Sequence, residues 1–294
     1  MSRANGFTFQ GRSVPVFRGR ATRILSRTTG FIAQAGFTHS LTPARNCVLG
    51  CTYCYVPTLG IYGGLKPVDW QRWGRHTTYK ENAGQLLRRE LRPGQRIYCS
   101  PLVDPYQPAE DVERLMPGLF EALLARPPAV FVIQTRATLA LRDAELMRRL
   151  SESTRFRVSF SLTTDRDDIR QLYEPHCESV AARVRAMEAL AAAGIAVHCT
   201  LAPILPCNPE RLADLVLGAT SCSVVADPLH TRTGKPRGAT TRPQAVRISR
   251  AKGFEQWHSP PFQAAIVQAI RSRVEAAGRR FGVGPEGFRM LASP

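Results

Sequence analysis

The sequence lacks any apolar run long enough to cross a membrane. Its longest weakly apolar stretch, ALAAAGIAV at 189–197, is less than half of the roughly 20 residues that a spanning helix needs. The first residues, MSRANGFTFQGR, contain no apolar segment of the kind that signal peptides carry. We therefore expect no membrane partner and a cytoplasmic protein, in which thiols stay reduced. Its eight cysteines are then expected to be ligands, reactive groups or small core residues rather than disulfides.

Acidic residues are missing from the first 37 positions, which carry six arginines. Residues 229–294 also have an excess of basic residues, with twelve Lys and Arg against three Glu. The two ends of the chain therefore hold most of the net charge of +17. Genome base composition can favour Arg over Lys, but it does not explain the missing acids. Basic segments that flank a near-neutral centre favour a polyanionic partner such as nucleic acid. Solvated tails are the alternative.

Between the two ends, short β-rich runs alternate with helical patterns. We expect strands over 38–45, 97–103, 129–135, 157–163, 197–204 and 221–227, and helices over 109–125, 179–193, 209–218 and 262–277. Such alternation is typical of βαβ units and a parallel sheet. Six units are too few for the usual eight-unit closed barrel. The predicted fold class is therefore α/β, a partial (β/α)6 barrel of TIM type with mostly parallel strands, or else an open sheet.

This pattern divides the chain into three expected parts. Residues 1–37 form a basic N-terminal arm, residues 38–230 the partial barrel, and residues 231–294 a basic C-terminal extension with a terminal helix.

Three cysteines stand close together directly after the first predicted strand. In CVLGCTYC, Cys47, Cys51 and Cys54 are spaced C-x3-C-x2-C. Structural zinc needs four protein ligands, usually in two close pairs, but the next cysteine, Cys99, is 45 residues further on. An iron–sulfur cluster with four irons and three protein thiolates would leave one iron open for chemistry. A structural zinc loop and a chance grouping of thiols are the alternatives.

The cysteine spacing, with Tyr53 before the last cysteine, resembles the signature of the radical S-adenosylmethionine (radical SAM) enzymes. Further stretches resemble the spore photoproduct lyase-like group of that family, often labelled DNA repair photolyases. They lie in order between residues 40 and 230 and leave the terminal segments uncovered: SPLVDPYQPAE (100–110), QTRATLALRD (134–143), LYEPHCESVAARVRAMEALAAAGI (172–195) and LAPILP (201–206).

The resemblance implies two cofactors, a [4Fe–4S] cluster and S-adenosyl-L-methionine. Cys47, Cys51 and Cys54 would hold the cluster, and its fourth iron would bind the methionine end of S-adenosylmethionine. One electron from the cluster would then cleave the sulfonium bond, and the resulting 5′-deoxyadenosyl radical would abstract a hydrogen atom from the substrate.

The resemblance also implies contacts with S-adenosylmethionine at the ends of the predicted strands. Arg136, where the family has Lys, would bind the methionine carboxylate, with a surface or salt-bridge arginine as the alternative. Ser100 and Asp104 would accept from the ammonium group or order the substrate, with loop capping as the alternative. Ser161, together with Thr163, would face the ribose. The full set of expected cofactor-binding residues is Tyr53, Ser100, Asp104, Arg136, Ser161 and Ala202.

Cys99 is the candidate for a catalytic side chain. The resemblance implies that a cysteine of the second strand could return a hydrogen atom to the product radical, and Cys99 lies in the comparable stretch. The alternative is a small buried hydrophobic residue. We interpret the remaining cysteines as structural: Cys177, Cys199, Cys207 and Cys222.

The expected function is that of a lyase-like or transferase-like radical SAM enzyme acting on nucleic acid, as in DNA repair. Expected partners are nucleic acid, bound through the basic terminal arms, and a low-potential electron donor similar to flavodoxin or ferredoxin. One alternative is radical modification of RNA, a peptide or a small metabolite. Another is an iron–sulfur or zinc protein that binds nucleic acid without turnover.

Overall fold

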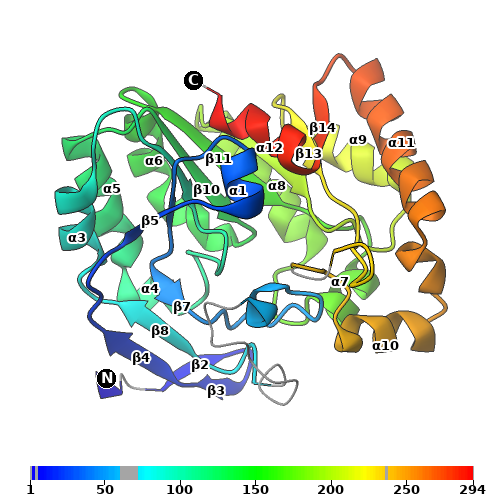
Figure 1. The fold of residues 1–294 in the computed structure, drawn as a ribbon, viewed down its shortest axis with the longest axis horizontal. Coiled ribbons are helices and arrows are strands. Elements are labelled where there is room, and N and C mark those ends of the chain that lie inside the picture. The colour runs from blue at the N-terminus through cyan, green and yellow to red at the C-terminus, as the bar shows by residue number, and fades with distance from the viewer. Residues whose placement is uncertain (1, 4–5, 60–71, 236–237, 294) are drawn as a thin grey trace.

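The computed structural model describes residues 2–3, 6–59, 72–235 and 238–293. At its centre is an eight-stranded sheet (Figure 1). The strand order is β14 (Phe281–Val283), β13 (Val224–Ala226), β12 (Val197–Leu201), β11 (Arg155–Ser161), β10 (Val130–Thr135), β9 (Arg96–Cys99), β6 (His39–Leu41) and β5 (Leu25–Arg27). All neighbours are parallel except β5 and β6. The protein thus has the predicted α/β fold with a mostly parallel sheet; closure into a partial barrel stays a prediction.

Each of the six predicted strands overlaps a strand of this sheet, but the first is split. β6 pairs with β9 in the central sheet, whereas β7 (Ala44–Arg45) pairs with β8 (Thr77–Lys80). The second sheet continues to β4 (Val16–Gly19) and β1 (Ser2–Arg3), and β2 (Phe7–Phe9) pairs separately with β3 (Arg12–Val14). Pro43 stands between β6 and β7 and has no N–H to donate to a ladder, which accounts for the break.

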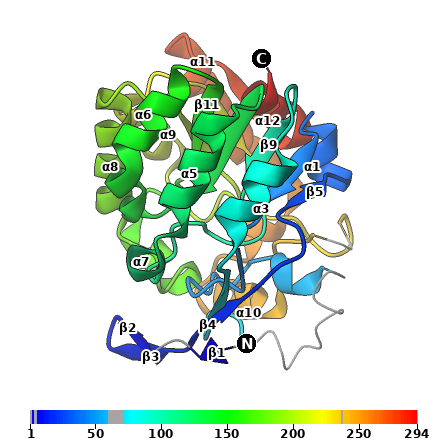
Figure 2. The same cartoon turned by 90° about the vertical axis from the view of Figure 1, so that its left-hand side faces the viewer.

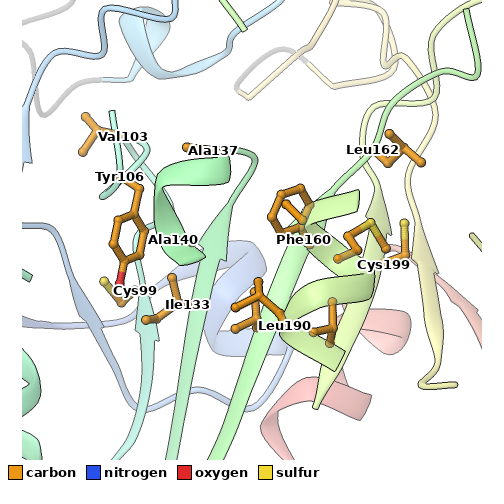
Figure 3. Close-up of a cluster of buried hydrophobic side chains, with 14 of the residues drawn as sticks. Cys99, Val103, Tyr106, Ile133, Ala137, Ala140, Phe160, Leu162, Leu190 and Cys199 are labelled. Carbon is orange, nitrogen blue, oxygen red and sulfur yellow. The ribbon is translucent and has the colours of Figure 1, made fainter. Parts of the chain in front are cut away.

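Helices cover one face of the central sheet, where they enclose the main hydrophobic core (Figure 2). Phe160, Leu190 and Cys199 belong to this core (Figure 3). The helices that cover this face are α3 (Ala83–Glu90), α5 (Leu115–Ala125), α6 (Ala144–Ser151), α8 (Val180–Ala192), α9 (Pro209–Ala219) and α11 (Pro260–Ala276).

The four predicted helices are present, and the side chains of Ser179 and Asn208 cap α8 and α9 by accepting from the backbone N–H three residues on. The helix expected over 109–125 is interrupted at Arg114, whose φ of 47° is left-handed. It therefore consists of α4 (Glu110–Glu113) and α5.

A smaller core lies on the other face of the sheet, under α1 (Gly30–Gln34) and α12 (Gly284–Ala292). Phe31 of α1 meets Phe288 of α12 edge to face, with ring centroids 5.1 Å apart. Tyr98, on the strand side of this core, lies 6.2 Å from the Phe288 ring. The two ends of the chain therefore close over the same face of the sheet.

The terminal segments take part in the sheet instead of lying outside it as arms. β5 comes from residues 1–37 and β14 from residues 231–294, so the limits predicted at 37 and 231 do not mark the edges of the sheet. Both strands have three residues, too few for an alternating pattern to stand out among the arginines. Residues 1, 4–5, 236–237 and 294 of these segments lie outside the described residues.

Candidate active site

The cysteine loop connects β7 to the short 3-10 helix η1 (Val56–Thr58). Cys47 and Cys51 are each 8% exposed, and Cys54 is partly buried. Other elements fix the loop from several sides. The Val48 N–H donates to the Gln107 side chain at 3.1 Å, the Thr52 N–H donates to the Tyr173 carbonyl at 2.9 Å, and the Tyr55 hydroxyl donates to the Pro101 carbonyl at 2.8 Å.

Gly50 lets the loop pass very close to a neighbouring segment. Its φ is +60°, a conformation that favours glycine. A Cβ on Gly74 would lie 2.7 Å from the Gly50 Cα, and one on Gly50 would lie 3.2 Å from the Gly74 Cα. The two backbones therefore touch at a point where neither residue can carry a side chain.

The three thiols fit an iron–sulfur cluster better than a zinc ion. All three are free, and they come from one buried loop. Within the described part of the chain, no group of three or more His, Cys, Asp and Glu side chains converges on a point where it could hold a metal ion. Zinc needs such convergence, whereas a cluster spreads its thiolates over separate irons. Cys47, Cys51 and Cys54 would each hold one iron.

A group of buried charges stands directly behind the loop. Nη1 of Arg136 donates to the Cys51 Sγ at 3.5 Å and to the Tyr53 hydroxyl at 2.7 Å. The same nitrogen forms an ion pair with Glu174, which also pairs with Arg183 at 2.6 Å. Burial alone would raise the pKa of Glu174, but the charges of Arg183 and Arg136 lower it to about 2. The carboxylate is thus held ionised between two arginines.

Cys177 also lies beside the loop, although the sequence predicted only a structural role for it. A hydrogen bond with Cys177 lowers the pKa of Cys51 in spite of burial, and the charge of Arg136 acts in the same direction. Burial raises the pKa of the Cys54 thiol to about 11.

Four of the residues expected to contact S-adenosylmethionine lie in a row at the carboxyl ends of adjacent strands. Ser100 follows β9, Arg136 follows β10, Ser161 ends β11 and Ala202 follows β12. Ser161 lies on the face of β11 opposite Phe160, and Ala202 packs against the smaller core that contains Tyr98, Val132 and Val225. The structure therefore brings these predicted residues together.

The hydroxyls of this row have no protein partner among the described residues. Oγ of Ser100, Oγ of Ser161 and Oγ1 of Thr163 are buried and make no hydrogen bond. One layer deeper, Ser159 donates to the Gln134 side chain at 2.8 Å and is also bonded to Thr200. Buried polar groups are rarely left unpaired, so the outer layer is suited to a polar ligand while the deeper layer is satisfied within the protein.

Asp104 mainly ties two loops together. Its carboxylate accepts from the Tyr106 N–H at 2.9 Å, the Thr135 hydroxyl at 2.8 Å and the Arg136 N–H at 2.9 Å. Burial raises the pKa of Asp104 in spite of these three donors. These contacts are the ones expected if Asp104 caps a loop. A contact between Asp104 and S-adenosylmethionine stays a prediction. They also fix the backbone from which the Arg136 side chain extends.

Cys99 is fully buried in the main core, on the opposite face of β9 from Tyr98. Figure 3 shows it near the hydroxyl end of Tyr106 and beside Ile133. Burial raises the pKa of its thiol. This position is typical of the small buried hydrophobic residue that was the alternative. Hydrogen-atom donation by Cys99 stays a prediction, and it would require the thiol to reach the other face of the sheet.

Comparison with known proteins decides the family. The model described as Radical SAM superfamily matches residues 41–217, more than half of the chain. The chain belongs to the Radical SAM superfamily. Its curated relatives include uncharacterized proteins of Mycobacterium bovis and Mycobacterium tuberculosis, each 29% identical over 217 residues. These alignments cover 70% of this chain and 62% of each relative, so the chain spans less than two thirds of their length. An uncharacterized protein of Acidianus two-tailed virus is 25% identical over 180 residues, which is 58% of each chain.

Among solved structures, the radical SAM chain is similar to spore photoproduct lyase. The structure of that enzyme complexed with dinucleoside spore photoproduct has a TM-score of 0.58 and 14% identity, over 91% of this chain and 81% of the other. A variant of the same enzyme with bound S-adenosylmethionine and dinucleoside spore photoproduct has a TM-score of 0.57. At this identity the likeness shows the fold alone. Within the described residues, no helix is both long and apolar enough to cross a membrane.

Sequence reasoning missed two residues of the radical SAM site. Glu174 lies in a stretch that carried the resemblance, but its spacing from Arg136 and Arg183 gave no sign of an ion pair. Arg242, at the start of α10 (Pro243–Ala251), is 1% exposed and donates to the Cys54 carbonyl at 3.1 Å. It was one of twelve basic residues in its segment, and no local pattern distinguished it.

Proposed function

We propose that this radical SAM enzyme acts on nucleic acid, in a lyase-like reaction of the kind spore photoproduct lyase performs. The family uses a [4Fe–4S] cluster and S-adenosylmethionine. When bound, these cofactors supply one-electron cleavage of S-adenosylmethionine and, through it, hydrogen abstraction from the substrate. The protein would have to place its substrate at the carboxyl ends of β9 to β12.

The chain's own residues would bind and shield the cofactors. Cys47, Cys51 and Cys54 hold the cluster in a loop from which water is largely excluded by burial. Arg136 offers positive charge to the methionine carboxylate while its Nη1 remains on the loop. A guanidinium has five N–H donors, so both contacts are compatible.

The remaining contacts would complete the pocket. The unpaired hydroxyls of Ser100 and Ser161 bind polar groups of S-adenosylmethionine, and Ala202, partly buried beside them, leaves room for the cofactor. Tyr53 orients Arg136 by accepting its N–H at 2.7 Å.

The observation that supports nucleic acid as the substrate is charge. The net charge is +17, and forty Lys and Arg stand against 23 Asp and Glu. The likeness in fold to a lyase whose bound ligand is a dinucleoside photoproduct agrees with it. We also propose a low-potential donor similar to flavodoxin or ferredoxin, and a cytoplasmic setting that keeps the free cysteines reduced.

The test supplies the reconstituted, dithionite-reduced enzyme with S-adenosylmethionine and dinucleoside spore photoproduct, and follows both compounds by mass spectrometry. We expect loss of the photoproduct only when S-adenosylmethionine is present. Formation of 5′-deoxyadenosine with an untouched photoproduct, in the dinucleoside and in DNA, would contradict the lyase-like reaction and favour RNA, peptide or metabolite modification.

A further inference from the structure

A cavity of about 460 Å³ borders the cysteine loop at Gly50. Besides this loop, four separate parts of the chain line it. They are β3 at Arg12, the segment 73–75, the turn 175–176 after α7 (Asp167–Tyr173), and α10 at Gln244 and Arg247. Both terminal segments, which carry the excess positive charge, therefore meet at this cavity beside the loop.

The lining is positively charged and has no acidic residue. It contains Arg12, Arg75 and Arg247, and none of the three forms an ion pair with another described residue. Nε and Nη2 of Arg12 are buried and have no hydrogen-bond acceptor within the described part of the protein. Three unpaired guanidinium groups around one cavity repel each other, so an anion bound among them would be favoured.

A further feature of the lining suits a phosphate group. The N-terminal end of α10, a nine-residue helix with no acid in its first turn, contributes Gln244, and helix N-termini attract anions. Trp73 lies in the same lining and adds an aromatic side chain to it. His176, next to Arg12, completes this side of the cavity.

We propose that this cavity binds a backbone phosphate of the nucleic-acid substrate and thereby holds the strand beside the cluster loop. The proposal rests on the nucleic-acid substrate proposed above. Guanidinium groups bind phosphate through paired N–H donors. A recessed site admits a phosphate and its sugar, whereas the carboxylates of an acidic redox protein stand on a folded surface and reach into such a recess poorly.

The test removes the three charges together in the full-length holoenzyme, as Arg12→Gln, Arg75→Gln and Arg247→Gln. Binding of a short fluorescein-labelled single-stranded DNA is measured by fluorescence anisotropy over a series of salt concentrations. We expect affinity to fall about 10- to 100-fold and the slope of log affinity against log salt to flatten by about 2 to 3.

The matched control removes the same charge elsewhere, as Arg23→Gln, Arg27→Gln and Arg89→Gln. These exposed arginines surround a different cavity, which also contains Glu90. We expect the control to change affinity less than threefold. Because Arg75 and Arg247 are exposed, their double variant keeps the test valid even where the change at Arg12 unfolds the N-terminal hairpin.

Each other outcome overturns the proposal in a distinguishable way. Equal losses in the triple variant and its control would overturn the phosphate site and leave the nucleic-acid substrate in place. Unchanged DNA affinity together with slower reduction of the triple variant by flavodoxin would assign the cavity to a redox partner. A native holoenzyme that binds neither DNA nor RNA would overturn the proposed substrate and the phosphate site with it.

Discussion

At the scale of single residues, the buried charges behind the cysteine loop connect the fold to the chemistry. Arg136 contacts Cys51 and Tyr53 and shares Glu174 with Arg183, so one guanidinium links the loop to α8. The spacing of the cysteines predicted the loop, and the resemblance predicted Arg136. The ion pairs behind them could not be predicted, because nothing in their sequence spacing indicates that these residues meet.

The first prediction concerns the ligands. Cys51→Ala is expected to reduce the iron content of the reconstituted protein to background, because a four-iron cluster loses one of three thiolates. Cys177→Ala is the matched control, since it removes a buried thiol next to Cys51 that lies outside the proposed ligand set. Iron analysis and visible absorbance measure both. Equal iron loss in the two variants would show that Cys177 is a ligand and that the assignment is wrong.

The second prediction concerns Glu174. Glu174→Gln leaves Arg136 and Arg183 buried without a counter-charge and is expected to cost about 3–5 kcal/mol in free energy of unfolding at neutral pH. The folded pKa of about 2 lies below the usual value near 4.3, so this stabilisation is complete above that value and is lost as the pH falls toward 2.

Urea unfolding at neutral pH and at about pH 3 measures this effect. The difference between native protein and variant should narrow in acid. The control Glu145→Gln, in an exposed ion pair with Arg148, should change stability little at either pH. A difference that stays the same in acid would contradict an ionised Glu174.

At the scale of elements, the cysteine loop packs against the backbone at Gly74, and the expected cofactor-binding residues lie at the ends of the parallel strands. Gly50 and Gly74 touch without side chains, and the residues expected to bind S-adenosylmethionine follow successive parallel strands. Alternation along the strands explains why Tyr98 and Cys99, adjacent in sequence, face different cores. Sequence alone predicted that the strands were there. The face of the sheet on which each side chain lies could be assigned only from the register of the strands.

The third prediction separates this close approach from backbone strain. In Gly74→Ala the new Cβ would lie 2.7 Å from the Gly50 Cα at a φ of +91°, so the cysteine loop must shift. We expect the iron content after reconstitution to fall by at least about half, as expected for a displaced ligand loop. Gly94→Ala is the control. The φ of Gly94 is +79°, but no atom lies within 4 Å of the position that its Cβ would take. This variant therefore has the backbone strain, about 1 kcal/mol, without the close contact. Normal iron content in Gly74→Ala would contradict the role of this approach.

At the scale of the whole molecule, both ends of the chain complete the sheet. β5 and β14 form its two edges, and α1 and α12 pack together on one face. The sequence predicted basic arms in place of these elements, because the terminal strands are short and the segments around them are rich in charged residues. The central strands were predicted because each is a run of apolar and β-branched residues between helices, whereas the terminal strands depend on contacts with distant segments.

The fourth prediction tests this closure. Phe288, 6% exposed, packs on Phe31 and Tyr98, so Phe288→Ala is expected to cost about 3–5 kcal/mol in free energy of unfolding. Chemical denaturation measures it, with Val112→Ala as the control, because that side chain is 65% exposed. A cost no greater than that of the control would show that the terminal helices are not part of the stable fold.

The most direct measurement is anaerobic production of 5′-deoxyadenosine by the native protein and by Cys51→Ala. Both are reconstituted with iron and sulfide, reduced with dithionite and given S-adenosylmethionine. The native protein is expected to form a brown cluster and 5′-deoxyadenosine, and the variant is expected to form neither above background. Equal production by the two proteins, or a native protein that assembles no cluster, would contradict the assignment of CVLGCTYC as the loop that holds the cluster.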